Sequence, residues 1–201
     1  MKLILASQSP RRRELLARMG LDFTVIAPQL DEDAFSDPDP AGLVQTLSRE
    51  KALAVAREQD PEALVIAADT VVVLDGKALG KPQDEAEAAA MLTALSGRSH
   101  EVYTGVTVCQ NSRALTGAEC TQVTFRPLTP GEIGSYVATG EPMDKAGAYG
   151  IQGLGSLLVE GIRGDYFNVV GLPVCRLGRM LAEFGVDCLA AAREKGKGKR
   201  E

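Results

Sequence analysis

Short apolar runs alternate with amphipathic stretches in the first half of the chain. Leu3 to Ala6 and Leu64 to Leu74 are apolar runs typical of buried strands, and Asp69-Thr70 interrupts the second run. Between the two runs, apolar residues recur at helical spacing after Pro40. This alternation of strands and helices predicts an α/β fold with a mixed, twisted sheet flanked by helices.

Capping residues mark the expected helix starts. Ser9-Pro10 and Asp39-Pro40 each place a capping side chain before a proline that suits the first helical turn. Thr129 and Glu132 form a capping box. We expect helices over residues 10–19, 40–58, 84–95, 130–137 and 173–184, and further strands over residues 23–26, 102–109, 122–125 and 156–162.

The remaining stretches predict how the chain is organised. Asp75-Gly76 is a hairpin-turn signal, and residues 139–155 are expected to be irregular and rich in glycine. We expect a single domain over residues 1–187, followed by a disordered basic tail over residues 188–201. Within that domain, two lobes are expected around a central cleft.

Composition narrows the function. The chain has 201 residues, of which 45% are apolar, so it can bury a sizeable core. A net charge of −5 and only 4% aromatic residues argue against binding to nucleic acid or to an anionic membrane surface. No apolar run reaches the roughly 20 residues of a membrane span, so we expect a soluble, cytoplasmic protein. The four scattered cysteines fit a reducing compartment, and the single histidine argues against a structural zinc site.

The turn Ser7-Gln8-Ser9-Pro10-Arg11-Arg12-Arg13 is the first candidate site. A helix N-terminus offers unpaired N–H groups and a positive dipole end, and arginine grips phosphate oxygens. A capped surface helix with solvated arginines would show the same pattern, so the pattern alone leaves both interpretations open.

Asp69-Thr70 is the second candidate site. A carboxylate within a buried strand is unfavourable without a partner, and metal binding or catalysis is the usual reason to keep one there. An Asp that caps a nearby turn is the alternative, but the flanking apolar residues leave little room for a solvated loop.

Lysines and a glycine-rich stretch complete the candidates. Lys81 lies in Gly80-Lys81-Pro82, and Lys51 could join it from the preceding helix. Each lysine alone is typical of a solvated surface. The same holds for Glu32, which lies in an acidic loop. The stretch from Asp144 to Gly153 suits a loop close to a ligand, with the Gln152 amide able to donate and to accept. Carboxylates, lysines and arginines together suit metal-assisted attack on a phosphate ester or anhydride.

These segments resemble the Maf family, also called septum-formation inhibitor proteins, from Leu3 to about Leu181. The order and spacing of the blocks make the match specific, and the resemblance implies a Maf/inosine-triphosphatase-like arrangement around a nucleotide cleft. The blocks are Ala6-Ser7-Gln8-Ser9-Pro10-Arg11-Arg12, Ala68-Asp69-Thr70-Val71-Val72, Gly80-Lys81-Pro82, Leu95-Ser96-Gly97, Thr104-Gly105-Val106, Asp144 to Gly153, and Asn168-Val169-Val170-Gly171-Leu172-Pro173.

The resemblance implies a pyrophosphatase that converts a nucleoside triphosphate to its monophosphate and pyrophosphate with a divalent metal, Mg or Mn. It also implies a homodimer. Arg11 occupies a position where the branch that acts on 7-methyl-GTP has an aromatic residue. The resemblance therefore implies the dTTP/UTP branch. The implied roles are catalysis by Asp69, metal binding by Glu32 and Asp69, triphosphate binding by Ser7, Arg12, Lys51 and Lys81, and specificity at Arg11, Thr70 and Gln152.

Two alternatives stay open. The chain could be a house-cleaning hydrolase for modified pyrimidine nucleotides, which a substrate panel would separate from a dTTP/UTP enzyme. It could also be a nucleotide-binding regulator of cell division whose hydrolysis is incidental. An Asp69→Asn variant would keep its cellular effect in that case.

Overall fold

The computed structural model describes residues 2–197, within which seven strands form one mixed sheet. The strand order is β2-β1-β3-β5-β6-β7, with β4 paired to β3. The strands are β1 (Leu3–Ala6), β2 (Thr24–Ile26), β3 (Leu64–Leu74), β4 (Lys77–Leu79), β5 (Ser99–Gln110), β6 (Arg113–Phe125) and β7 (Val159–Arg163). The expected α/β class with a mixed sheet is confirmed.

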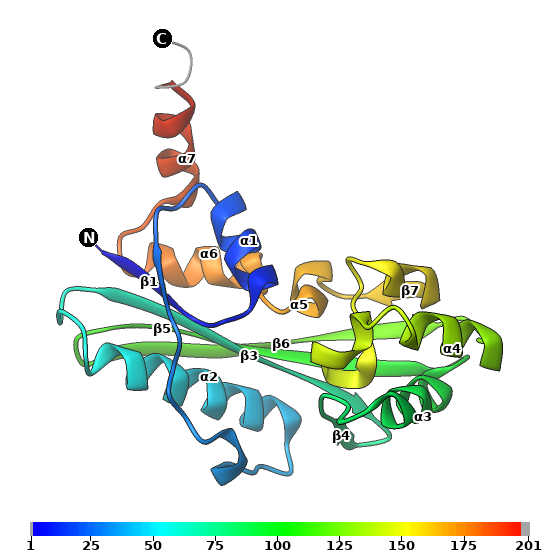
Figure 1. The fold of residues 1–201 in the computed structure, drawn as a ribbon. Helices are drawn as coiled ribbons and strands as arrows, with labels where there is room; N and C mark the ends of the chain where they lie inside the picture. Colours follow the sequence, from blue (N-terminus) through cyan, green and yellow to red (C-terminus); the bar gives the residue numbers. More distant parts are fainter. Residues whose placement is uncertain (1, 198–201) are drawn as a thin grey trace. The chain divides into compact units, whose positions relative to one another are not determined.

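The helices vary widely in length, as the ribbon in Figure 1 shows. The α-helices are α1 (Pro10–Arg18), α2 (Pro40–Ala56), α3 (Glu85–Leu95), α4 (Pro130–Val137), α5 (Tyr166–Val170), α6 (Val174–Ala182) and α7 (Cys188–Lys197). Short 3₁₀ helices are η1 (Glu32–Ala34), η2 (Glu141–Asp144), η3 (Ala146–Ala148) and η4 (Leu154–Leu158). None of the helices within residues 2–197 is both long and apolar enough to cross a membrane.

Contacts along the chain define two compact units that interleave in sequence. Unit 1 comprises Met1–Asp69, Gly105–Ala118 and Gly171–Glu201, and unit 2 comprises Thr70–Thr104 and Glu119–Val170. The three long strands β3, β5 and β6 each contribute residues to both units.

Unit 1 is built around β1, which pairs in parallel with β2 and with β3. All four residues of β1 are buried, as expected for a parallel strand covered on both faces. Helix α2 covers one face, and α1 and α6 cover the other (Figure 1). Ala52 and Val55 of α2 pack on Ile4, Val65 and Ala67 of the strands, so α2 is fixed against β1 and β3.

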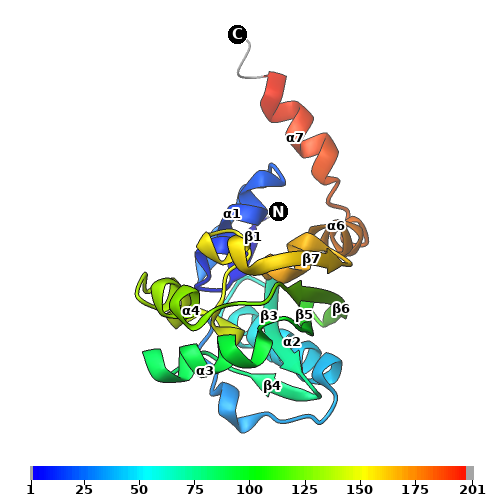
Figure 2. The same ribbon diagram turned by 90° about the vertical axis from the view of Figure 1, so that its right-hand side faces the viewer.

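Unit 2 contains the end of β3, which turns back into β4 as a hairpin. Asp75 and Gly76 occupy the turn with φ of 52° and 74°, the left-handed values that a two-residue turn of this type requires. Helices α3 and α4 pack together (Figure 2). The hairpin predicted from Asp75-Gly76 is therefore confirmed.

A histidine lies in the aromatic core of unit 2. His100 is 2% exposed, its Nε2 lies 2.8 Å from the Tyr149 hydroxyl, and it packs edge-on against the rings of Phe125 and Tyr149. Burial lowers the pKa of His100 to about 4. The residue is therefore neutral near pH 7 and packs as a core side chain.

Four elements differ from the sequence predictions. Strand β6 begins at Arg113 rather than at residue 122, and β7 begins at Val159 because the preceding residues form η4. The short helix α5 was not predicted. Helix α7 occupies Cys188–Lys197, where a disordered tail was expected, because Asp187 caps its start and Leu-Ala-Ala-Ala favours helix. The expectation for residues 198–201 lies outside the described residues.

Candidate functional site

The turn after β1 places a hydroxyl and a guanidinium side by side. Ser7 is buried, and α1 begins at Pro10 with Ser9 as its N-cap. The Ser7 hydroxyl oxygen accepts from the backbone N–H of Ser9 at 3.2 Å and from Arg12 Nη1 at 3.4 Å. Arg12 Nε donates to the backbone carbonyl of Gly171 at 2.8 Å. These bonds fix the Arg12 guanidinium beside Ser7.

A buried lysine from α2 joins two carboxylates. Lys51 Nζ lies 2.6 Å from Asp69 Oδ1 and 2.9 Å from Glu32 Oε1. The exposed fractions of the side chains are 8% for Lys51, 11% for Asp69 and 55% for Glu32. A carboxylate so far from water needs a cationic partner, and Lys51 supplies it.

Arg12 lies within electrostatic reach of the same carboxylates. Burial lowers the pKa of Arg12 below its ordinary value; the negative charge of Asp69 opposes this shift, the positive charge of Arg11 adds to it, and Glu32 opposes it. The guanidinium stays charged despite this shift. Lys51 and Arg12 therefore balance the charges of Asp69 and Glu32, and a bound triphosphate would call for further positive charge.

Asp69 and Glu32 are the residues that fit a hard divalent cation. Both carboxylates contact the same atom, Lys51 Nζ, so their oxygens face a common point. Mg²⁺ is commonly held by one or two carboxylates together with waters and substrate phosphates. Within residues 2–197, no group of three His, Cys, Asp or Glu could hold a metal ion. Lys51 Nζ occupies the point that both carboxylates contact, so a metal on this pair would use their other oxygens and take its remaining ligands from water or a substrate.

Three other predicted site residues lie in unit 2. Thr70 is partly buried, whereas Lys81 and Gln152 are exposed. The N–H of Gly147 donates to the carbonyl of Gly80 at 3.0 Å, so the segment that carries Lys81 is tied to the loop that carries Gln152. In unit 1, the structure brings together Ser7, Arg12, Lys51, Asp69 and Glu32, with Arg11 beside Arg12 on α1.

Glu141 shapes the glycine-rich loop, although it was not among the predicted site residues. Its Oε2 accepts from the N–H of Leu154 at 2.9 Å, and its Oε1 accepts from the N–H of Gly155 at 3.0 Å and from the Tyr136 hydroxyl at 2.9 Å. Burial favours a raised pKa for Glu141, but these donors outweigh burial and hold it below its ordinary value. The available signal was an acidic residue at the start of the glycine-rich stretch over residues 139–155.

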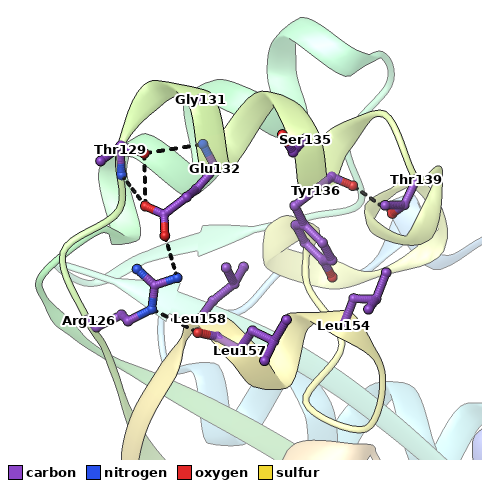
Figure 3. Close-up of a pocket in the computed structure, with 10 residues that line it drawn as sticks. All are labelled: Arg126, Thr129, Gly131, Glu132, Ser135, Tyr136, Thr139, Leu154, Leu157 and Leu158. Atoms are coloured by element: carbon purple, nitrogen blue, oxygen red, sulfur yellow. Dashed lines mark hydrogen bonds and ion pairs between the residues drawn. The ribbon is translucent and has the colours of Figure 1, made fainter.

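A pocket of about 630 Å³ lies in unit 2 (Figure 3). Arg126 forms one side, where it pairs with Glu132 at 2.7 Å and donates from Nε to the carbonyl of Leu157 at 2.9 Å. None of the predicted site residues lines this pocket. The lining residues are Arg126, Thr129, Gly131, Glu132, Ser135, Tyr136, Thr139, Leu154, Leu157 and Leu158.

Comparison with known proteins places the chain in a family. The family model described as Maf-like protein matches residues 2–184. The chain belongs to the Maf family. A Maf relative from Moorella thermoacetica, named dTTP/UTP pyrophosphatase, is 58% identical over 188 residues, covering 92% of this chain and 96% of that protein. A protein of the same name from Symbiobacterium thermophilum is 54% identical over 184 residues, covering 92% and 94% of the two chains.

Among solved structures, a nucleoside-triphosphatase (dITP/XTP pyrophosphatase) from Mycobacterium abscessus aligns with a TM-score of 0.45 at 15% sequence identity, covering 92% of this chain and 97% of that chain. The resemblance to the Maf family that the motifs indicated is confirmed by the family match over residues 2–184.

Proposed function

We propose that this chain is a nucleoside triphosphate pyrophosphatase that hydrolyses dTTP and UTP to the monophosphate and pyrophosphate. The observation that carries the proposal is the buried Asp69–Lys51 pair in a chain that is 58% identical to a dTTP/UTP pyrophosphatase. The contacts of Lys51 with Asp69 and Glu32 support a site for anionic substrate and cation together.

Asp69 is the proposed catalytic residue. An ionised carboxylate only accepts hydrogen bonds, so Asp69 can orient a water molecule and take its proton as the water attacks phosphorus. The anhydride bond between the α and β phosphates then breaks, and pyrophosphate leaves with the electron pair of that bond. The proton on Asp69 returns to solvent after the products leave.

Ser7, Arg12, Lys51 and Lys81 are proposed to hold the triphosphate. Arg12 supplies a planar guanidinium that matches phosphate oxygens, and Lys51 and Lys81 supply compact point charges. Glu32 and Asp69 would hold the divalent metal, Mg or Mn, which polarises a phosphoryl oxygen when bound. The fixed geometry of Arg12 beside Ser7 supports this assignment, because a preformed donor set needs no rearrangement during the reaction.

Arg11, Thr70 and Gln152 are proposed to select the base. The exposed Gln152 amide can donate to and accept from the Watson–Crick edge of uracil or thymine. We extend the proposal to a cytoplasmic homodimer that does not bind nucleic acid, and the net charge of −5 supports the last point. Light scattering at several protein concentrations tests the dimer.

Pyrophosphate release from a panel of nucleoside triphosphates tests the proposal. The panel contains dTTP, UTP, CTP, GTP and methylated pyrimidine triphosphates, each with Mg, with Mn and with a chelator. We expect metal-dependent release from dTTP and UTP by the wild type, lost in Asp69→Asn, which keeps the shape of the side chain but removes its charge.

Asp75→Asn is the matched control for Asp69→Asn. Asp75 is an exposed carboxylate in the β3–β4 turn that pairs with Arg98 at 2.6 Å, so this variant should keep full turnover. No release from any triphosphate by the wild type would contradict the proposed function. Strong release from methylated nucleotides over dTTP and UTP would replace it with the house-cleaning activity.

A further inference from the structure

A chain of hydrogen bonds in unit 2 begins at an accessible residue and ends in the core. Thr70 is half-buried, whereas every other residue of β3 is buried, and Thr104 and Asn168 are 0% exposed. Thr70 Oγ1 lies 2.9 Å from Thr104 Oγ1. Thr104 Oγ1 in turn donates to the backbone carbonyl of Asn168 at 2.9 Å.

The direction of these bonds follows from counting hydrogens. A hydroxyl has one hydrogen to donate. The hydrogen of Thr104 goes to the carbonyl of Asn168, which can only accept. The oxygen of Thr104 must therefore accept in its contact with Thr70, and Thr70 is the donor. Towards any further partner, the Thr70 oxygen can then act only as an acceptor.

The carbonyl of Asn168 is the last acceptor in this series of hydrogen bonds, and the side chain of Asn168 is itself held by hydrogen bonds. Its Nδ2 donates to the carbonyl of Val102 at 2.9 Å and to the hydroxyl of Thr121 at 3.0 Å. Thr121 gives its own hydrogen to the carbonyl of Asp165 at 2.9 Å, so it can only accept from Asn168. Both amide hydrogens of Asn168 are used. The acceptor that orients Thr104 is therefore held in place by the core of unit 2.

We propose that Thr104, acting through Thr70, makes the site favour a pyrimidine with a hydrogen-bond donor at N3. Uracil and thymine carry N3–H, whereas cytosine presents a bare acceptor nitrogen at the same position. An acceptor-only Thr70 pairs with N3–H and faces the cytosine nitrogen lone pair to lone pair, an arrangement that a polar site rejects. This inference rests on the proposed function. Thr104 is a positioning residue, because it acts on the substrate only through Thr70.

Thr104→Val tests the inference, because valine keeps the shape of threonine and removes the hydroxyl. The hydrogen of Thr70 then loses Thr104 as its acceptor, so Thr70 is no longer restricted to accepting from the base. The readouts are the ratio of kcat/KM for UTP over CTP and the ratio of affinities for UMP over CMP by calorimetry. Each pair shares sugar and phosphates, so the ratios report on the base alone. We expect both ratios to fall about fivefold, the effect of one neutral hydrogen bond.

Thr107→Val is the matched control. Thr107 lies three residues further along β5, is also 0% exposed, and forms hydroxyl contacts with Ser48 at 3.0 Å and Thr116 at 2.9 Å. Its loss should lower stability as much as the loss of Thr104 while leaving both ratios at the wild-type value. Thr104→Ser restores the hydroxyl and should restore the ratios.

The outcomes separate this inference from the proposed function. Equal loss of activity on UTP and CTP in a folded Thr104→Val variant overturns the inference and leaves the pyrophosphatase standing. Equal affinities of the wild type for UMP and CMP overturn the inference, whether or not the protein hydrolyses triphosphates. A wild type that prefers UMP but hydrolyses no triphosphate contradicts the proposed function alone. If Thr104→Val loses its native circular dichroism, Thr70→Val must show the same fall in the affinity ratio.

Discussion

Lys51 and Asp69 stabilise the molecule only as a pair. Their side chains are 8% and 11% exposed, and their charged atoms lie 2.6 Å apart. Removing Lys51 leaves the Asp69 carboxylate, which is largely shielded from water, without the cation that contacts it, and this is far less favourable than removing both charges.

Lys51→Met should lower the free energy of unfolding by about 3 kcal/mol, because Asp69 loses its buried partner. The double variant Lys51→Met/Asp69→Asn should recover most of that loss. Urea denaturation at pH 7 measures both. Lys77→Met, which changes an exposed lysine on β4, is the control and should shift stability by less than about 0.5 kcal/mol. A Lys51→Met variant as stable as this control would contradict the prediction.

His100 should make stability depend on pH between about 4 and 6.5. Its pKa is lowered by burial to about 4 in the native state, against about 6.5 in an unfolded chain. Above pH 6.5 both states are neutral and the stability is complete. As the pH falls through this range, the unfolded state takes up a proton that the native state does not. The free energy of unfolding should therefore decrease, by about 3 kcal/mol in total.

The single histidine makes this prediction clean to test. Urea unfolding of the wild type and of His100→Gln is measured from pH 4 to pH 7. The carboxylates titrate in both proteins, so the difference between the two profiles belongs to His100. Parallel profiles would show that His100 is protonated inside the native core.

Residue types were easier to predict from the sequence than residue partners. Asp69 was expected to need a partner because a lone carboxylate is unfavourable in a buried strand. Nothing local identified Lys51 as that partner, because the pairing arises only when α2 packs on β3. Thr104 lay within a recognised block, but its direction of donation depends on Asn168, which is distant in sequence. The catalytic and binding roles of the site residues stay predictions.

Helix starts are the elements that the local sequence predicted best. Ser9, Asp39 and Thr129 cap α1, α2 and α4 as expected, because a cap involves residues within one turn of each other. The start of β6 was missed because its first half shows no alternation of buried and exposed positions. Pairing between strands, rather than local pattern, decides how far such a strand extends.

Gly105 is the position in β5 where packing between elements excludes any side chain. A Cβ there would lie 2.0 Å from the carbonyl oxygen of Val44 in α2. Gly105→Ala should therefore cost about 3 kcal/mol or more of the free energy of unfolding. Gly178→Ala, in α6, is the matched control: a Cβ there meets nothing within 4 Å, so stability should rise by about 0.5–1 kcal/mol. Thermal denaturation of both variants measures the contrast, and equal stabilities would exclude a tight α2–β5 contact.

The division of the chain into interleaved units is a property of the whole molecule that no local pattern reveals. Unit 1 takes three segments of the chain and unit 2 takes two. The α/β class followed from the order of elements, but the grouping depends on contacts between residues far apart in sequence. The family match ends at residue 184, before α7.

A chain that ends at Asp187 should therefore keep full pyrophosphate release. Its free energy of unfolding should change by less than about 0.5 kcal/mol, because none of residues 188–193 is fully buried and Leu189 is 84% exposed. A chain that ends at Gly171 is the control and should not fold, because it also loses Leu177 and Leu181, which are 0% exposed. Loss of turnover in the longer truncation would assign α7 a part in the activity.

The interleaving also sets an order of events on the ribosome. Chains are made from the N-terminus, and compact units fold when all of their segments have emerged. Unit 2 has its last segment once Val170 is outside the exit tunnel, whereas unit 1 still waits for the residues from Gly171 onward. The strand Leu3–Ala6, among the first residues to emerge, thus belongs to the part completed last. We expect the apolar side chains of this strand to stay accessible during synthesis until the residues from Gly171 onward have emerged.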